Sequence, residues 1–398
     1  MKILAIHNFH RSGSASGDDQ VFKNETAMLE KKGHEVVRFS ISNDEFDQAG
    51  LWSKLMTPFK MLWSFKNYKA VQKLIEESDP DLVHVHTFFP LLSPSILYAV
   101  KRTGKKLVAT LHDTRFVCPV ATSLRDNELC NLCGDGKYLR MAKYGCFKGS
   151  KAQSLVVAAI FKYHRYRRTF YEQIDKYICL NDEQIGLLKG IGFDPQKIVK
   201  KYNFVADADA LTSTFDRSGL PDRYVVFYGR IGEEKGIRTL MQIWDKIEDI
   251  ALVVMGGGPL EEEFSAWAKK HPNVYDLGYT PHEKCLSIVK EGEFIVFPSI
   301  WYEGCSMVEI EAQSLYKPIV ATDLGFSREA IKDGVNGIKV PLGDVEGFIK
   351  AIRDLWDDPE RLAVMKANAR AEYEKKYTPE DNYEQLMDIY KELCGGDK

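Results

Sequence analysis

Short apolar runs that alternate with helix-like segments constrain the fold of this chain more than any other feature of its sequence. In the first half, helical patterns such as residues 21–32 and 68–77 lie between most of these runs. The strand-like runs are residues 2–6, 34–39, 81–85, 106–110 and 176–179. Such alternation predicts a parallel sheet with helices on both faces, and ligands then bind beyond the carboxyl ends of the strands.

The same alternation restarts in the second half, after an Asp- and Ala-rich stretch at residues 206–214 that we interpret as an interdomain linker. Its strand-like runs are residues 224–228, 251–255, 274–277, 294–297, 318–321 and 337–340. A chain of 398 residues is too long for one ordinary core. The sequence therefore predicts an α/β protein with two doubly wound parallel-sheet domains. Their expected bounds are 1–205 and 206–377, with a final helix at 378–398 that packs back on the first domain.

Charge and hydropathy exclude several classes of function. The net charge of −3 gives no overall attraction to nucleic acid, so any anionic ligand must be bound by local groups. The apolar run in the first ten residues is too short for a signal peptide, and no stretch approaches the roughly 18 apolar residues of a membrane span. We expect a cytoplasmic protein, whose thiols are then reduced.

Residues 299–317, SIWYEGCSMVEIEAQSLYK, follow an apolar run and predict a loop and a helix N-terminus, which is a site for anions. Glu303 and Glu311 lie eight positions apart. If the helix begins near Glu303, their backbones are about 12 Å apart at about 1.5 Å of rise per residue. That exceeds the roughly 5 to 9.5 Å between the carboxyl groups of glycoside hydrolases. The pattern favours a long polar ligand with phosphates between its ends, such as a nucleotide-sugar.

Two further strand ends in the second half offer ligand-binding groups. Arg230 follows the run 224–228, and Lys235 precedes the next helix-like segment. A guanidinium group binds phosphate oxygens through two hydrogen bonds and an ammonium group adds charge, so the two residues can stabilise a leaving diphosphate without a metal. The alternative is an ion pair within the loop, to Glu233 or Glu234. After residues 251–255, a glycine turn that includes Gly258 lets a flat base approach the backbone.

In the first half, the loop at residues 11–17 is rich in small residues and opens a helix, which suits either phosphate approach or a flexible crossover. His112 ends the run 106–110, where it can donate a hydrogen bond to a developing charge, orient a sugar hydroxyl or serve as a structural cap. His84 and His86 alternate along one strand and point to the same side. We interpret them as packed histidines and not as metal ligands, because no third ligand is evident nearby.

Half of the eight cysteines lie in residues 114–150, a segment that interrupts the alternation. They are Cys118, Cys130, Cys133 and Cys146, in the pattern C-x11-C-x2-C-x12-C. Four thiolates can complete a tetrahedral structural zinc site, and such a site would stabilise a segment with little core of its own. The alternative is a set of free, redox-sensitive thiols.

Residues 155–177 start apolar and continue with basic and aromatic side chains. We interpret this run as a core helix with a solvated basic face, and the alternative is a helix that lies on an anionic membrane surface. Residues 360–376 and 380–393 predict two polar helices, with Thr378 as the N-cap residue of the second because Pro379 follows it.

Together these motifs resemble the retaining glycosyltransferases of family 4, which have the GT-B fold of two facing Rossmann-like domains. The resemblance covers essentially the whole chain. It rests on the E-x7-E pair with EGCSMVEIEA, the GR-x4-KG segment, the GGGPL turn, the DLGYTP strand exit, the His112-Asp113 pair and the glycine loop ahead of KNETAMLEKKGHEV. The first loop departs from the family pattern, with Ser16-Gly17-Asp18 where two adjacent glycines are usual.

The resemblance implies a role for each matching residue. His112 and Glu303 would lie at the donor sugar, Glu311 at the ribose hydroxyls, and Arg230 and Lys235 at the diphosphate. The other implied donor contacts are Gly17, Gly258, Gly304, Cys305, Ser306 and Met307.

The reaction implied is a metal-independent, retaining transfer from a UDP- or GDP-linked sugar to a glycan or lipid-linked acceptor, in surface polysaccharide or glycoconjugate assembly. No cofactor is required, and peripheral membrane contact would involve residues 155–177. The alternatives are a non-catalytic subunit that binds nucleotide or glycan, and a nucleotide-sugar epimerase of the same fold.

Overall fold

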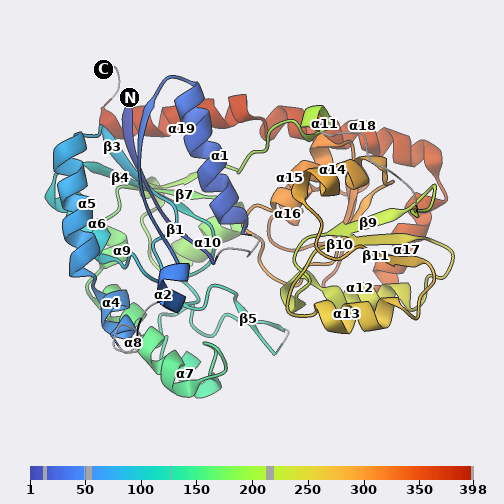
Figure 1. Ribbon diagram of the computed structural model, residues 1–398, viewed down its shortest axis with the longest axis horizontal. Helices are drawn as coiled ribbons and strands as arrows, with labels where there is room; N and C mark the ends of the chain where they lie inside the picture. The colour runs from blue at the N-terminus through green and yellow to red at the C-terminus, as the bar shows by residue number, and fades with distance from the viewer. Residues whose placement is uncertain (12–15, 49, 51–55, 127, 212–218, 396–398) are drawn as a thin grey trace. The chain divides into compact units, whose positions relative to one another are not determined.

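The computed structural model describes residues 1–11, 16–48, 50, 56–126, 128–211 and 219–395 (Figure 1). The chain forms two compact units. The first unit comprises Met1–Ser123, Cys130–Tyr202 and Asn382–Lys398, and the second comprises Leu124–Leu129 and Asn203–Asp381. No helix among the described residues is long and apolar enough to cross a membrane.

The first unit is built on a six-stranded parallel sheet with the strand order β2-β1-β3-β4-β7-β8. Its strands are β1 (Lys2–Phe9), β2 (Glu35–Ser42), β3 (Leu82–Val85), β4 (Lys106–Leu111), β7 (Lys176–Cys179) and β8 (Ile198–Lys200). β3 and β7 are buried along their whole length, as expected where helices cover both faces of a sheet. The strand order reverses between β1 and β3, which makes the carboxyl ends of these two strands the expected position for a ligand.

The helices of this unit connect successive strands. They are α1 (Gly17–Lys31), α2 (Asp44–Gln48), α4 (Thr57–Leu62), α5 (Phe65–Ser78), α6 (Ser95–Arg102), α7 (Arg140–Tyr144), α8 (Lys151–Tyr166), α9 (Thr169–Glu172) and α10 (Asp182–Gly190), with the 3-10 turn η1 (Pro195–Lys197). Ser16, Ser64, Ser150 and Asn181 each accept a hydrogen bond from the first turn of the helix that follows. These N-caps explain where α1, α5, α8 and α10 begin.

The second unit has its own six-stranded parallel sheet, with the order β11-β10-β9-β12-β13-β14. Its strands are β9 (Val225–Tyr228), β10 (Leu252–Met255), β11 (Val274–Asp276), β12 (Ile295–Phe297), β13 (Ile319–Thr322) and β14 (Gly337–Val340). Its helices are α11 (Ala208–Leu211), α12 (Ile237–Trp244), α13 (Glu261–Ala268), α14 (His282–Glu291), α15 (Met307–Ser314), α16 (Ser327–Ala330), α17 (Val345–Trp356) and α18 (Pro359–Lys376), with the 3-10 turn η2 (Glu233–Lys235). The order reverses between β9 and β12, and both strands lead into predicted site residues.

The strand-like runs of the sequence correspond to strands in both units, and the structure adds β8 and the short hairpin of β5 (Leu124–Arg125) and β6 (Glu128–Leu129). β8 has only three residues, all half-buried, so it lacks the apolar run that identifies a strand. The expectation of one helix at residues 155–177 is wrong. α8 ends at Tyr166, Arg168 adopts a left-handed conformation, and β7 begins at Lys176.

The last helix, α19 (Pro379–Cys394), begins as the sequence predicts, because Thr378 Oγ1 accepts a hydrogen bond from the Asp381 amide at 3.2 Å. Most of this helix belongs to the first unit. Tyr390 bonds to His84, and Glu392 pairs with Lys176 at 2.6 Å. Residues from the far end of the chain therefore complete the first unit.

Candidate functional site

The N-terminus of α15 is the centre of the candidate site in the second unit. Ser306 caps the helix by accepting a hydrogen bond from the Glu309 amide, and Met307 is the first helical residue. The helix thus begins four residues after Glu303, so the premise of a helix starting near Glu303 is wrong and the 12 Å estimate does not apply. Amide groups of the first helical turn have no partner within the helix, which makes this end of α15 suited to an anion.

Glu303 and Lys235 form a close ion pair at this helix end. Lys235 Nζ lies 2.6 Å from Glu303 Oε1, and the two side chains are only 19% and 8% exposed. Ser299 donates a second hydrogen bond to the same carboxylate oxygen, at 2.9 Å. Loops that follow two different strands, β9 and β12, thus supply the cation and the anion.

Arg230 is more accessible than Lys235. Its guanidinium Nε lies 3.5 Å from a Glu234 carboxylate oxygen, and 54% of the side chain is exposed. The loop ion pair considered from the sequence therefore exists for Arg230, to Glu234. A long ion pair whose cation is exposed contributes little to stability, so a phosphate group can replace Glu234 at small cost.

Two glycines allow the backbone segments of this site to approach one another. Gly236 has φ = +71°, and a Cβ atom there would lie 1.9 Å from the carbonyl oxygen of Pro298. A Cβ atom at Gly258 would lie 2.5 Å from the carbonyl oxygen of Ile231. Glycine at these positions lets the loop that carries Lys235 pack on the exit of β12, and the turn after β10 pack on the exit of β9.

Glu311, the second glutamate of the E-x7-E pair, is buried in α15. One of its oxygens accepts a hydrogen bond from Tyr228 at 3.2 Å, and the other lies 2.8 Å from His282 Nε2. The bond to Glu311 raises the pKa of His282 above its ordinary value. His282 is largely exposed, so it can move aside and leave the carboxylate to accept bonds from ligand hydroxyls.

Glu309 is a site residue that the sequence reasoning missed. It is fully buried in the first turn of α15, beside Ser306 and Ser327. Burial, together with the charge of Glu303, raises the pKa of Glu309 to about 8, so it carries a proton at neutral pH. The S-x-x-E pattern of Ser306 and Glu309 is a capping-box signal that could have identified it.

Cys305 connects the candidate site to the segment that begins the second unit. The side-chain amide of Asn203 donates to the carbonyl oxygen of Cys305 at 3.0 Å, and the backbone N–H of Asn203 donates to the Cys305 sulfur at 3.3 Å. Gly304, Ser306 and Met307 are on either side of this anchored residue. The backbone before α15 is therefore held in place by Asn203.

In the first unit, His112 directly follows β4 and is partly exposed. Its Nε2 lies 3.1 Å from Nδ1 of His86, and burial lowers the pKa of His112 to about 4. The neighbouring Asp113 instead pairs with Arg115, at 3.0 Å. Of these two residues, His112 contacts a buried side chain, that of His86.

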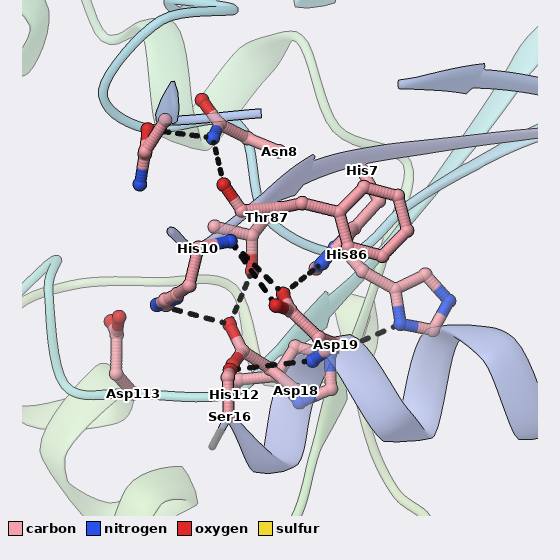
Figure 2. A network of polar contacts seen from close by, with 12 residues as sticks. His7, Asn8, His10, Ser16, Asp18, Asp19, His86, Thr87, His112 and Asp113 are labelled. Carbon is pink, nitrogen blue, oxygen red and sulfur yellow. Dashed lines mark hydrogen bonds and ion pairs between the residues drawn. The ribbon is translucent and has the colours of Figure 1, made fainter. Parts of the chain in front are cut away.

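The start of α1 lies close to His112, as Figure 2 shows. Asp18 accepts hydrogen bonds from Ser16 and from Thr87, and the neighbouring Asp19 binds His7 at 2.8 Å. Burial opposes the ionisation of Asp18, but interactions with His112 and His10 outweigh it, and the pKa of Asp18 lies well below its usual range.

The charge of Asp18 bears on the role expected for Gly17, the first residue of α1. An ionised carboxylate next to Gly17 repels a phosphate group and favours a hydroxyl group or a cation at this helix end. Residues 12–15 of the predicted phosphate loop lie outside the described residues.

His84 and His86 are buried as packed histidines, and both lie 3.1 Å from the carboxylate of Glu25. The ligand atoms of these three residues come within 4.8 Å of one another, as do those of His7, Asp18 and Asp19. Lys201 already supplies a cation to Glu25, at 3.2 Å. In the group of Glu25, His84 and His86, the Lys201 ammonium group therefore already occupies the place of a cation.

The four cysteines of residues 114–150 gather around Cys133. Burial, followed by the charges of Cys118, Cys146 and Cys130, raises the pKa of the Cys133 thiol to about 12. All four lie in the first unit. Among the described residues, the groups with three ligand atoms within 4.8 Å of one another do not include these thiols.

Comparison with known families gives two matches that follow one another along the chain. Residues 17–208 match the model described as Glycosyltransferase Family 4, and residues 214–372 match the model described as Glycosyl transferases group 1. Among curated proteins, the chain is 27% identical to an alpha-D-kanosaminyltransferase of Streptomyces kanamyceticus, over 87% of this chain and 84% of that protein. It is 21% identical to the O-antigen chain mannosyltransferase C of Escherichia coli, over 99% of both chains.

Solved structures match over nearly the whole chain. Anabaena Alr3699/HepE in complex with UDP-glucose superposes with a TM-score of 0.70 at 18% identity, over 99% of this chain and 100% of that one. A sucrose-phosphate synthase from Thermosynechococcus elongatus superposes with a TM-score of 0.73 at 18% identity, over 99% of both chains. These similarities show the GT-B fold, with its two Rossmann-like parallel sheets.

Proposed function

From the premise that this chain belongs to the family 4 glycosyltransferases, we propose that it transfers a sugar from a UDP- or GDP-linked donor to a glycan or lipid-linked acceptor, with retention of anomeric configuration and without a metal. The relatives named above are an alpha-D-kanosaminyltransferase and an O-antigen chain mannosyltransferase, which supports a role in polysaccharide or glycoconjugate assembly. The UDP-glucose complex of a structural relative supports a nucleotide-sugar as donor.

The observation that carries this proposal is the arrangement at the start of α15. Lys235 pairs with Glu303 just before α15, and Arg230 follows β9, whose last residue, Tyr228, donates a hydrogen bond to Val308 of that helix. A diphosphate leaving group needs positive charge, which a helix N-terminus and nearby cations can supply. Charge-assisted hydrogen bonds from these two cations can stabilise that leaving group in place of a metal ion. Amide groups from Gly304 to Met307 would contact sugar hydroxyls and phosphate, and Gly258 would approach the base.

The two carboxylates then have separate roles. Glu303, held by Lys235 and Ser299, would contact the donor sugar near its reacting carbon. Glu311 would bind the ribose hydroxyls. The acceptor hydroxyl would attack from the face that the diphosphate leaves and pass its proton to the departing phosphate oxygen, so that a C–O bond forms as the other breaks. In the first unit, His112 would contact the sugar, and Gly17 would lie near the donor.

Donor turnover tests the proposal directly. The protein is incubated with a panel of UDP- and GDP-sugars and lipid-linked acceptors, and nucleoside diphosphate release is measured. We expect release that depends on acceptor and persists in EDTA, and an α-linked product from an α-linked donor by NMR. Conversion of the donor without acceptor would instead indicate an epimerase, and donor binding without turnover would indicate a binding subunit.

Two variants test the assignments of residues. Arg230→Ala should weaken diphosphate binding, and Glu303→Ala should abolish the chemical step while donor binding remains measurable. Normal turnover by Arg230→Ala would remove the diphosphate assignment. An unchanged rate for Glu303→Ala would remove the catalytic one.

We also propose peripheral membrane contact through α8 and the neighbouring α4, which lie side by side in Figure 1. Phe59 of α4 is 64% exposed, and Tyr166, at the end of α8, is 85% exposed. Lys162 and Arg167 are also exposed. Exposed aromatic and basic side chains on neighbouring helices suit the interface of an anionic bilayer. Such a position would bring the enzyme to a lipid-linked acceptor.

Vesicle binding tests this surface. The double variant Phe59→Ser/Tyr166→Ser should bind vesicles that contain anionic lipid about tenfold more weakly than the wild type, because aromatic burial is lost. Tyr279→Ser, which changes a 75% exposed tyrosine in the second unit, is the control and should bind normally. Equal binding by all three proteins would contradict the proposal.

A structural zinc bound by Cys118, Cys130, Cys133 and Cys146 is a separate proposal. A zinc ion would reverse the charge environment that raises the pKa of the Cys133 thiol and would convert the thiols to thiolates. Metal analysis of chelator-free protein should give about one zinc per chain. Cys133→Ser should lose it, whereas Cys285→Ser, at a buried cysteine in the second unit, should keep it. Zinc-free wild-type protein with four titratable thiols would contradict the proposal.

A further inference from the structure

A line of hydrogen bonds runs from His112 into the interior of the first unit. His112 Nε2 lies 3.1 Å from His86 Nδ1, and His86 Nε2 lies 3.1 Å from Glu25 Oε1. The other oxygen of Glu25 accepts from Lys201 Nζ at 3.2 Å. Apart from His112, the proposed reaction gives none of these residues a task.

The direction of every bond in this line follows from Lys201. The Lys201 ammonium group can only donate, and it is buried between Glu25 and Asn382 Oδ1, which is 3.0 Å away. Burial opposes the ionisation of Glu25, but interactions with the Lys201 ammonium group, and then with His84 and His86, outweigh it and hold its pKa well below its usual range. An ionised carboxylate can only accept, so His86 must donate from Nε2.

Both imidazoles of the line are neutral at neutral pH. Burial lowers the pKa of His86 to about 3 and that of His112 to about 4. A neutral imidazole has one donor and one acceptor nitrogen. Because His86 donates from Nε2, its Nδ1 accepts, and His112 must donate to it from Nε2. Nδ1 of His112 is then an acceptor, and it has no hydrogen-bond partner among the described residues.

We propose that Glu25 and His86 are positioning residues that fix His112 as the Nε2–H tautomer, so that His112 offers substrate only a hydrogen-bond acceptor. The identity of the ligand beside His112, a donor sugar, rests on the proposed function. The sequence left two active roles open for His112, donation to a developing charge and orientation of a sugar hydroxyl. The hydrogen-bond geometry selects the second, with the hydroxyl donating to Nδ1.

Nitrogen NMR of the full-length protein labelled at histidine tests the tautomer without any turnover. The His112 signals are identified by their loss in His112→Gln. In the wild type near pH 7, we expect a protonated Nε2 and an unprotonated Nδ1. A proton on Nδ1 would overturn the proposal. The one variant that this measurement needs, His112→Gln, leaves the buried Glu25 and His86 in place.

Glu25→Gln should exchange the donor and the acceptor in each hydrogen bond that joins residue 25, His86 and His112. Since Lys201 only donates, the amide oxygen must face Lys201, and the amide hydrogens then face His86. His86 must shift its proton to Nδ1, and His112 must shift its own to Nδ1 as well. We expect the NMR signature of His112 to invert and kcat/KM to fall by roughly tenfold or more, as for other partners that orient a functional histidine.

Tyr390→Phe is the matched control, because it removes a hydroxyl 2.7 Å from His84 in the same cluster but leaves Glu25 and His86 in place. It should keep the wild-type tautomer and kcat/KM. A fall in kcat/KM for Glu25→Gln with an unchanged His112 tautomer would mean a merely structural effect and would overturn the proposal. A wild type that turns over no donor would contradict the proposed function and leave the tautomer result intact.

Discussion

Lys201 in the first unit is buried and bonds to Glu25, which two histidines also contact, whereas Arg230 in the second unit is half exposed and faces Glu234 at 3.5 Å. Both are cations just beyond the carboxyl end of a strand in a parallel sheet. A buried charge that is paired and hydrogen-bonded is costly to disturb, while a long, partly exposed pair is easily replaced by a ligand. This difference indicates that Lys201 stabilises the fold and that Arg230 is available to bind a ligand.

Removing Lys201 should produce the largest loss of stability. Lys201→Met leaves the Glu25 carboxylate buried without its cation, and we expect the free energy of unfolding to fall by about 3–5 kcal/mol. Lys200→Met changes the adjacent, more exposed lysine, which pairs with Asp182 at the surface, and should cost less than about 1 kcal/mol. Urea unfolding of both variants checks this; equal stabilities would remove the contrast between the two regions.

Removing Lys235 should affect activity more than stability. It lies beside Glu303 at the proposed diphosphate position, and Lys235→Met should lower kcat/KM by about 10²–10³-fold, as for loss of one group that stabilises transition-state charge. Lys246→Met removes a surface pair with Glu346 in the same unit and should have wild-type kinetics. Steady-state kinetics with the best donor measure this. Wild-type kcat/KM for Lys235→Met would mean that Lys235 does not act on the donor.

Acidification should destabilise the first unit through its histidines. The pKa values of His86 and His112, about 3 and about 4, lie below the ordinary value of 6.5. Between these values the unfolded chain binds protons that the folded chain does not, so the free energy of unfolding should decrease as pH falls from about 6.5 towards 4. Urea unfolding at pH 7, 6 and 5 measures this, and His112→Gln should reduce the slope.

Glu309 gives the second unit the opposite dependence. Its pKa is raised from 4.5 to about 8, so the folded chain keeps a proton that the unfolded chain releases above pH 4.5. This contribution is complete below pH 4.5 and is lost as pH rises towards 8. Glu309→Gln, which cannot ionise, should flatten the loss of stability between pH 6 and 8; an unchanged slope would contradict the raised pKa.

The smallest effect is expected from Glu234→Gln. Removing this half-buried partner of the exposed Arg230 should change stability by less than about 1 kcal/mol and lower the KM for donor by about twofold, because the guanidinium group no longer has to leave a carboxylate. A large rise in KM would show that Glu234 itself holds Arg230 in the binding position.

The sequence predicted most of the fold, because apolar runs and caps are local features. The two sets of strands, the N-cap at Thr378 and the loop before α15 could all be read from neighbouring residues. It also predicted that His112 stands at a strand end. It missed β8, whose half-buried residues lack an apolar run, and it extended the helix at residues 155–177 past a left-handed Arg168.

By itself, the sequence determined which residue types stand at each strand end, and so the class of ligand they suit. Only the tertiary structure decided their partners. Lys235 meets Glu303 and not its neighbour Glu234, and Glu25 meets Lys201, which is 176 positions away. The physical reason is that pairing of charges depends on burial and distance in space, which periodicity along the chain does not encode. The tautomer of His112 depends on the same long-range pairing.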